Sequence, residues 1–185
     1  MRRRLLLARR ELDGPAQEQA ARMIASKIVA SVEARSTTGR VAAYLAYSGE
    51  LDLGPALDAL VERGHEIVLP VCGPDFSMDF CPWAPGDALV AGPYGIGEPQ
   101  TERVDIETID TVLVPGVGFG ADGSRIGHGA GYYDRFFARC AARPHDPRRL
   151  GIAHDLQVVR LPAPEPWDVA MHEIITPAKV IHVSN

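Results

Sequence analysis

The segment GSRIGHGAGYYDR, Gly123 to Arg135, combines flexible backbone with side chains that bind anions and metal ions. The G-x-G-x-G pattern from Gly127 to Gly131 allows positive φ angles and close backbone approach, so that several N–H groups can point at one anion. Arg125 can hold a phosphate through two hydrogen bonds, and Asp134 can share a Mg²⁺ ion with phosphate oxygens. These residue types favour a phosphate-binding loop.

The same residues also fit a purely structural turn. Glycines relieve strain in any crowded turn, and Asp134 is favourable in the first turn of a helix. The pattern is not a P-loop, which ends in G-K-[ST], nor the dinucleotide fingerprint G-x-G-x-x-G, because position 132 is a tyrosine. This mismatch disfavours an NAD-dependent Rossmann oxidoreductase. The residues alone therefore favour the phosphate loop and leave the turn open.

The elements around this segment predict a parallel sheet that would position it. The apolar run at 109–116, directly before the loop, is typical of a central strand buried on both faces. A strand at 40–47, a helix at 54–65 and a strand at 66–71 form a right-handed crossover with parallel pairing. A helix at 132–142 follows the loop, so its N-terminal dipole would favour an anion there.

Further helices are expected up to Leu12 and from Pro15 to about Ala34, where Pro15 suits a helix start. An edge strand or hairpin arm is expected at 76–83, and strands at 149–153, 173–177 and 179–183. The order predicts an α/β fold: a single-domain three-layer α/β/α sandwich over residues 1–185 with a mostly parallel central sheet. Ligands of such sheets bind beyond the carboxyl ends of the strands, where the glycine loop lies.

Composition and charge exclude several function classes. The 185 residues are 46% hydrophobic with a net charge of −5, which indicates one globular core and disfavours nucleic-acid or anionic-membrane binding. No stretch approaches the roughly 20 apolar residues of a membrane span, and MRRRLLLARR lacks a secretory apolar core. Three cysteines without C-x-x-C disfavour disulfides and zinc. We expect a cytoplasmic monomer with no nucleic-acid or membrane partner.

The longer stretch VLVPGVGFGADGSRIGHGAGYYDRFF resembles the signature of the 5-formyltetrahydrofolate cyclo-ligase family, roughly VPG-x-AFD-x-x-G-x-RLG-x-G-x-GYYDR. AAYLAYSGELD, ALVAGPYGIGEP and PWDVAMHEIITP resemble further family segments in the same order. The resemblance implies a single-domain α/β enzyme that uses ATP and Mg²⁺. It would convert 5-formyltetrahydrofolate into 5,10-methenyltetrahydrofolate, ADP and phosphate.

Carried over by matching position, the resemblance also implies site residues. The ATP-binding set would be Arg3, Arg125, Gly127, His128, Gly129, Ala130, Gly131, Tyr132 and Tyr133. The folate-binding set would be Leu45, Glu50, His128, Gly129, Ala130, Gly131 and Tyr132. Arg125, Tyr132 and Asp134 would be catalytic, and Asp134 and Asp168 would be the Mg²⁺ ligands. Core packing remains open for Leu45 and Trp83, and a solvated loop carboxylate remains open for Glu50.

Departures from the family pattern motivate a second hypothesis. The family's N-terminal lysine would fall before Met1, Gly120 replaces an aspartate, and His172 replaces the second acid of D-x-x-x-D. In the glycine loop, His128 stands at a position that is commonly aromatic or basic, and Ala130 stands at a glycine or lysine position. The alternative is a catalytically weak relative that acts as a nucleotide- or folate-binding regulatory module.

Overall fold

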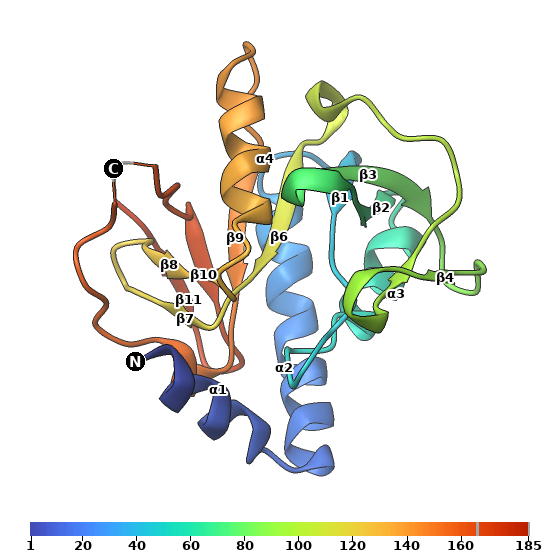
Figure 1. Ribbon diagram of the computed structural model, residues 1–185. Helices are drawn as coiled ribbons and strands as arrows, with labels where there is room; N and C mark the ends of the chain where they lie inside the picture. The colour runs from blue at the N-terminus through green and yellow to red at the C-terminus, as the bar shows by residue number, and fades with distance from the viewer. Residues whose placement is uncertain (166, 185) are drawn as a thin grey trace.

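The computed structural model describes residues 1–165 and 167–184, and its centre is a seven-stranded sheet (Figure 1). The sheet has the order β11-β10-β9-β6-β1-β2-β3. Its strands are β1 (Arg40–Ala42), β2 (Glu66–Cys72), β3 (Met78–Trp83), β6 (Thr111–Pro115), β9 (Arg148–Ile152), β10 (Glu173–Ile175) and β11 (Val180–His182). The pairs from β2 to β10 are parallel, whereas β3 and β11 pair antiparallel at the two edges.

Four α-helices accompany the sheet in the described ranges: α1 (Arg2–Arg10), α2 (Gly14–Glu33), α3 (Gly54–Glu62) and α4 (Tyr132–Ala141). Helices α2 and α3 pack on one face of the sheet and α4 on the other (Figure 1). Alternate residues of the inner strands supply the two cores: Val41 and Ile67 face α2 and α3, whereas Ala42 and Val68 belong to the core beneath α4. The predicted three-layer α/β/α sandwich is therefore confirmed.

Local sequence signals fix several element ends. Asp13 caps α2, because its Oδ1 accepts a hydrogen bond of 2.9 Å from the N–H of Ala16, and Pro15 occupies the first turn. Gly64 follows α3 with a φ of +85°, a left-handed conformation that glycine adopts without strain. The predicted crossover between β1 and β2 is parallel, as expected.

The strand connections diverge at one point of the sheet. The chain runs from β1 through α3 to β2 on one side, and from β6 through α4 to β9 on the other. Neighbouring strands β1 and β6 therefore send their following loops to opposite faces. In doubly wound sheets, a crevice forms at the carboxyl ends of such a strand pair.

Two features differ from the sequence-based expectations. Strand β1 ends at Ala42 rather than continuing to Tyr47. Beyond it, the N–H of Ala43 still donates to the carbonyl of Val68 at 2.9 Å, and the buried hydroxyl of Tyr44 donates to the carbonyl of Leu51 at 3.1 Å. The glycine-rich segment contains a small hairpin of β7 (Gly118–Phe119) and β8 (Arg125–Ile126) instead of a plain loop.

Short elements complete the chain. A second small hairpin joins β4 (Val90–Ala91) and β5 (Gly97–Glu98). Single 3-10 turns lie at η1 (Pro74–Phe76), η2 (Pro93–Gly95), η3 (Ile106–Thr108) and η4 (Asp155–Gln157). Across the described ranges, no helix combines the length and the apolar character that crossing a membrane requires.

Candidate active site

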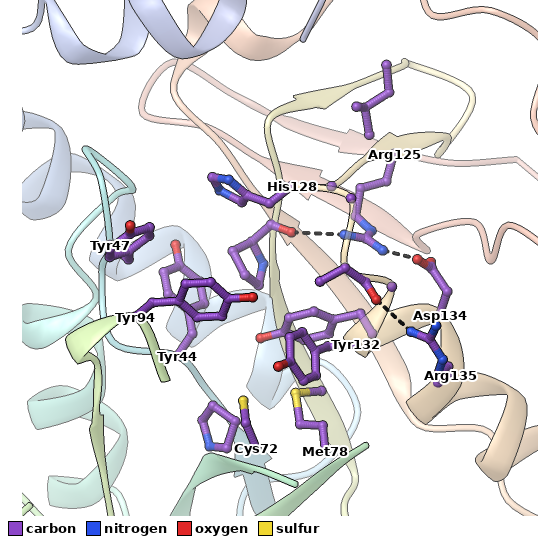
Figure 2. Close-up of a pocket in the computed structure, with 18 of the residues that line it drawn as sticks. Tyr44, Tyr47, Cys72, Met78, Tyr94, Arg125, His128, Tyr132, Asp134 and Arg135 are labelled. Carbon is purple, nitrogen blue, oxygen red and sulfur yellow. Dashed lines mark hydrogen bonds and ion pairs between the residues drawn. The ribbon is translucent and has the colours of Figure 1, made fainter. Parts of the chain in front are cut away.

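A cavity of about 990 Å³ lies at the carboxyl ends of β1 and β6 (Figure 2). The loop after β1, the loop between β6 and α4, and the β4–β5 arm contribute to its wall. Tyr44, Tyr47 and Tyr94 lie on one side, whereas Arg125, Asp134 and Arg135 lie on the other. All but one of the site residues expected from the resemblance line this cavity: Leu45, Glu50, Arg125, residues 127–134 and Asp168. The exception is Arg3.

Arg125 reaches the cavity from β8 and is held on several sides. Its Nη2 donates to Asp134 Oδ1 at 2.7 Å, its Nη1 donates to the carbonyl of Pro115 at 3.4 Å, and its guanidinium lies over the ring of Tyr133. The Arg125 side chain is 7% exposed. Its buried Nε has no protein partner among the described residues. The guanidinium is thus fixed in place with donor capacity left for a ligand.

The glycine loop has the backbone geometry that its composition predicts. Gly129 and Gly131 have φ angles of +113° and +75°, which a side chain would strain. No hydrogen bond within the described parts of the chain engages the N–H groups of residues 128–130. Gly131 precedes the first residue of α4, so the loop ends at a helix N-terminus. Free amides and a helix dipole both favour a bound anion.

Two further arginines reach the same wall. Arg135 Nη1 donates to the carbonyl of Ala130 at 2.6 Å, and its guanidinium lies 5.3 Å from the ring centre of Phe76, so it ties the glycine loop to the β2–β3 turn. Arg2 lines the cavity, and its Nη1 lies 3.8 Å from the position a Cβ would occupy at Gly129. Arg3 is exposed and does not line the cavity.

Two aspartates from distant segments line the cavity and could serve Mg²⁺. Asp134 uses Oδ1 for Arg125, and Asp168 Oδ2 accepts a hydrogen bond of 2.8 Å from the N–H of Glu165. The second oxygen of each carboxylate therefore takes part in neither of these hydrogen bonds. No cluster of three or more His, Cys, Asp or Glu that could hold a metal occurs within the described residues. Two carboxylates completed by water and phosphate oxygens fit Mg²⁺, which is seldom bound by protein groups alone.

Glu50 lies on the turn after β1, where it lines the cavity and contacts the glycine loop. Its side chain is 8% exposed, and its Oε1 lies 3.2 Å from His128 Nε2 on the glycine loop. Its Oε2 accepts a hydrogen bond of 3.2 Å from the N–H of Tyr47. The open alternative of a solvated loop carboxylate does not describe this group, because Glu50 is largely buried and contacts two segments.

Aromatic and thiol groups form the remaining wall. The rings of Tyr47 and Tyr94 lie 6.4 Å apart at the cavity mouth. Burial, followed by neighbouring Cys72 and Tyr94, raises the pKa of Tyr132 to about 12. Burial, followed by the Glu98 carboxylate, raises the pKa of the Cys72 thiol to about 11. Both groups are therefore neutral near pH 7, where they act as hydrogen-bonding and packing groups.

Two departures from the family pattern lie outside the cavity. A Cβ at Gly120 would collide with Asp122 Oδ1 and Ser124 Oγ, because Asp122 caps this turn through Ser124. Hydrogen bonds from Ser124 lower the pKa of Asp122. His172 Nδ1 accepts from the N–H of Arg149 at 3.0 Å. Burial, followed by Arg149, lowers the pKa of His172. Both positions support local structure, whereas His128 and Ala130 line the cavity.

Sequence reasoning missed some of the lining. Tyr94 and Glu98 belong to the segment PYGIGEP, whose resemblance to the family was a usable signal without a residue assignment. The resemblance assigned an ATP contact to Arg3, whereas the structure has the neighbouring Arg2 in the cavity wall. Leu45 both lines the cavity and packs on the core, while Trp83 packs on the core and is not among the lining residues.

Comparisons with known proteins show the family of the chain. A family model described as the 5-formyltetrahydrofolate cyclo-ligase family matches residues 1–177. The chain is 34% identical over 146 residues to the Escherichia coli K12 5-formyltetrahydrofolate cyclo-ligase, covering 76% of this chain and 79% of that protein. It is 34% identical over 150 residues to the Mycolicibacterium smegmatis protein of the same name, covering 76% and 75%.

Solved structures give the same result. The Aquifex aeolicus 5,10-methenyltetrahydrofolate synthetase superposes with a TM-score of 0.83 at 29% identity, covering 100% of this chain and 91% of that one. The Mycoplasma pneumoniae 5,10-methenyltetrahydrofolate synthetase superposes with a TM-score of 0.77 at 25% identity, covering 95% and 96%.

Proposed function

The chain belongs to the 5-formyltetrahydrofolate cyclo-ligase family of enzymes, and from that premise we propose that it closes 5-formyltetrahydrofolate to 5,10-methenyltetrahydrofolate at the expense of ATP. One observation carries the proposal. A single cavity brings a loop suited to phosphate together with Glu50, a largely buried carboxylate 78 residues away from His128 in the chain. A nucleotide and a nitrogen-rich ring can therefore meet in one enclosure.

The ATP phosphates occupy the glycine-loop side. Residues 127–131 offer backbone N–H groups, and Arg125 and Arg2 supply positive charge beside them. Arg135 holds the loop through Ala130. Tyr132 and Tyr133 follow at the start of α4 and complete this wall. The protein's task here is positioning and charge stabilisation, which dominate phosphoryl transfer.

The folate occupies the Glu50 side. A carboxylate can accept two hydrogen bonds from the amino group and ring N–H of the pterin. Leu45 offers apolar surface on the same side, and the segment from His128 to Tyr132 lies between the two ligands. The formyl group then faces the ATP γ-phosphate.

The chemistry needs no enzyme nucleophile. The formyl oxygen attacks the γ-phosphorus, and the bond to ADP breaks. N10 then attacks the activated formyl carbon and passes its proton to the phosphate, which is released as the carbon–oxygen bond breaks. The oxygen of the formyl group leaves in the phosphate, so the atoms balance. Tyr132 and Cys72, neutral near pH 7, take no part as nucleophiles.

Asp134 and Asp168 are the residues that would hold Mg²⁺. When bound, the ion neutralises negative charge on the phosphates. Asp134 also keeps Arg125 directed along the cavity wall through their 2.7 Å ion pair.

The test is the ultraviolet absorbance of the methenyl product. The purified protein is incubated with 5-formyltetrahydrofolate, ATP and Mg²⁺, and with each component omitted in turn. We expect product only in the complete mixture. Tight folate binding without product would instead support the second hypothesis, a binding or regulatory module.

A further inference from the structure

Helix α1 places one buried arginine beneath the Glu50 turn. Arg9 is 1% exposed, although it belongs to an otherwise exposed basic stretch. Its Nε and Nη2 donate to the carbonyl of Ser48 at 3.2 and 2.9 Å, and its Nη1 donates to the carbonyl of Gly116 at 3.2 Å. Arg9 thus joins α1 to the loops after β1 and β6, the two strands that flank the cavity.

The turn that Arg9 supports is strained. Ser48 has a φ of +52°, a left-handed conformation uncommon for a residue with a side chain. Gly49 follows with a φ of +80°. His154 Nε2 lies 3.2 Å from the Gly49 carbonyl, and Gln157 Nε2 donates to the Gly116 carbonyl at 2.7 Å. A buried polar layer therefore holds this turn in a conformation that the chain would not adopt unaided.

The positive charge of Arg9 indicates a role beyond its hydrogen bonds to the carbonyls of Ser48 and Gly116. Its Nη1 lies 3.9 Å from Glu50 Oε1, and both side chains are buried. Burial lowers the pKa of Arg9, and the Glu50 charge raises it again. Burying a cation is energetically unfavourable unless an anion lies beside it. A neutral hydrogen-bond donor could satisfy the carbonyls of Ser48 and Gly116 equally well. The positive charge of Arg9 is needed only for its pairing with Glu50.

We propose that Arg9 is a positioning residue for substrate recognition: it holds the Glu50 carboxylate in place and oriented for a ligand that presents adjacent N–H donors. The ligand class, an aminopyrimidine edge, rests on the proposed function. Arg9 does not line the cavity and so touches no ligand. It acts through Glu50 and through the Ser48–Gly49 turn.

The first test compares Arg9→Met with Arg10→Met. Arg10 is the matched control, because it bonds the same turn through the Ser48 hydroxyl but is exposed. In Arg9→Met we expect the KM for 5-formyltetrahydrofolate to rise about tenfold while the KM for ATP stays within about twofold. Arg10→Met should leave both unchanged. Equal folate KM values in wild type and Arg9→Met would overturn the proposal.

A double-mutant cycle separates positioning from general loss of structure. Glu50→Gln should raise the folate KM by a similar factor, and the Arg9→Met/Glu50→Gln double variant should be little worse than either single variant. If the folate KM of the double variant rose by the product of the two single-variant factors, Arg9 would act independently of Glu50, and the proposal would be wrong.

A ligand-free measurement keeps the proposal testable if Arg9→Met does not fold. Glu50→Gln removes the anion beside a buried cation, so its melting temperature should fall below that of wild type. An unchanged or raised melting temperature would contradict the pairing. This readout is independent of turnover: a wild-type protein that forms no methenyl product refutes the proposed function, whereas the melting comparison still decides the Arg9–Glu50 pair.

Discussion

Asp134→Asn separates the metal role of Asp134 from its structural one. The carboxylate is 30% exposed and pairs at 2.7 Å with Arg125, which is 7% exposed. Asparagine keeps the shape and an oxygen that can still accept from Arg125, but it lacks the negative charge. The substitution therefore removes charge at the proposed Mg²⁺ position while preserving most of the packing.

The two roles predict effects of different size. A charge-assisted hydrogen bond is roughly twice as strong as a neutral one, so the loss of stability is about 1 kcal/mol after allowance for solvent exposure. For a chain of this length, that lowers the melting temperature by about 2–4 °C. Loss of a group that stabilises transition-state charge lowers kcat by about 10²–10³.

The assay measures methenyl-folate formation against Mg²⁺ concentration, together with thermal unfolding of the same samples. Asp79→Asn is the control, because Asp79 is 23% exposed, forms ion pairs with Arg139 at 2.7 Å and with Arg103 at 3.2 Å, and is not among the residues that line the cavity. We expect the control to lose at least as much stability, because it weakens two ion pairs, and to lose little activity. If Asp134→Asn kept kcat and its Mg²⁺ dependence within a few-fold of wild type, the metal assignment would be refuted.

Three further outcomes are expected. Arg2→Ala should raise the KM for ATP about tenfold and Arg3→Ala should not, as steady-state kinetics can show; the reverse order would favour the sequence-based choice of Arg3. Gly131→Ala should lower the melting temperature through a cost of about 1–2 kcal/mol at its φ of +75°, whereas Gly14→Ala, with open space at its Cβ, should not; equal melting temperatures would contradict this. Burial, followed by Arg9, lowers the pKa of His154, so as pH falls below about 6.5 the unfolded chain binds the proton first and stability falls. Denaturant titrations at several pH values give the slope of the unfolding free energy against pH, to which one histidine contributes at most about 1.4 kcal/mol per pH unit. His154→Gln should reduce this slope, and identical slopes in wild type and variant would refute the assignment.

The strand pattern made most of the fold predictable. A continuous apolar run marked β6 as a strand covered on both faces, the strand–helix–strand order predicted the parallel pairing of β1 with β2, and Pro and Gly marked the helix ends. The glycine loop could then be placed at the carboxyl end of β6 before any side-chain position was known. Periodicity gave no warning that β1 would end at Ala42, because the apolar run continues through Tyr44 and Leu45 without a break.

The role of Arg9 shows why parts of the site could not be predicted. In sequence, Arg9 is one of several arginines in a short basic stretch, and its helical spacing does not distinguish it from Arg10. Its partners are backbone carbonyls 39 and 107 residues away, and carbonyls carry no sequence signal. The same reason applies to Arg2, whose proximity to Gly129 arises only after α1 packs against the η4 turn.

The most direct test of the central claim is the stoichiometry of one reaction. The wild-type protein is supplied with 5-formyltetrahydrofolate, ATP and Mg²⁺, and the ADP and 5,10-methenyltetrahydrofolate formed are measured together. The proposed phosphorylation of the formyl oxygen predicts one ADP for each methenyl product, with neither formed when folate is omitted. Methenyl product without ADP, or ADP release with no methenyl product, would contradict it.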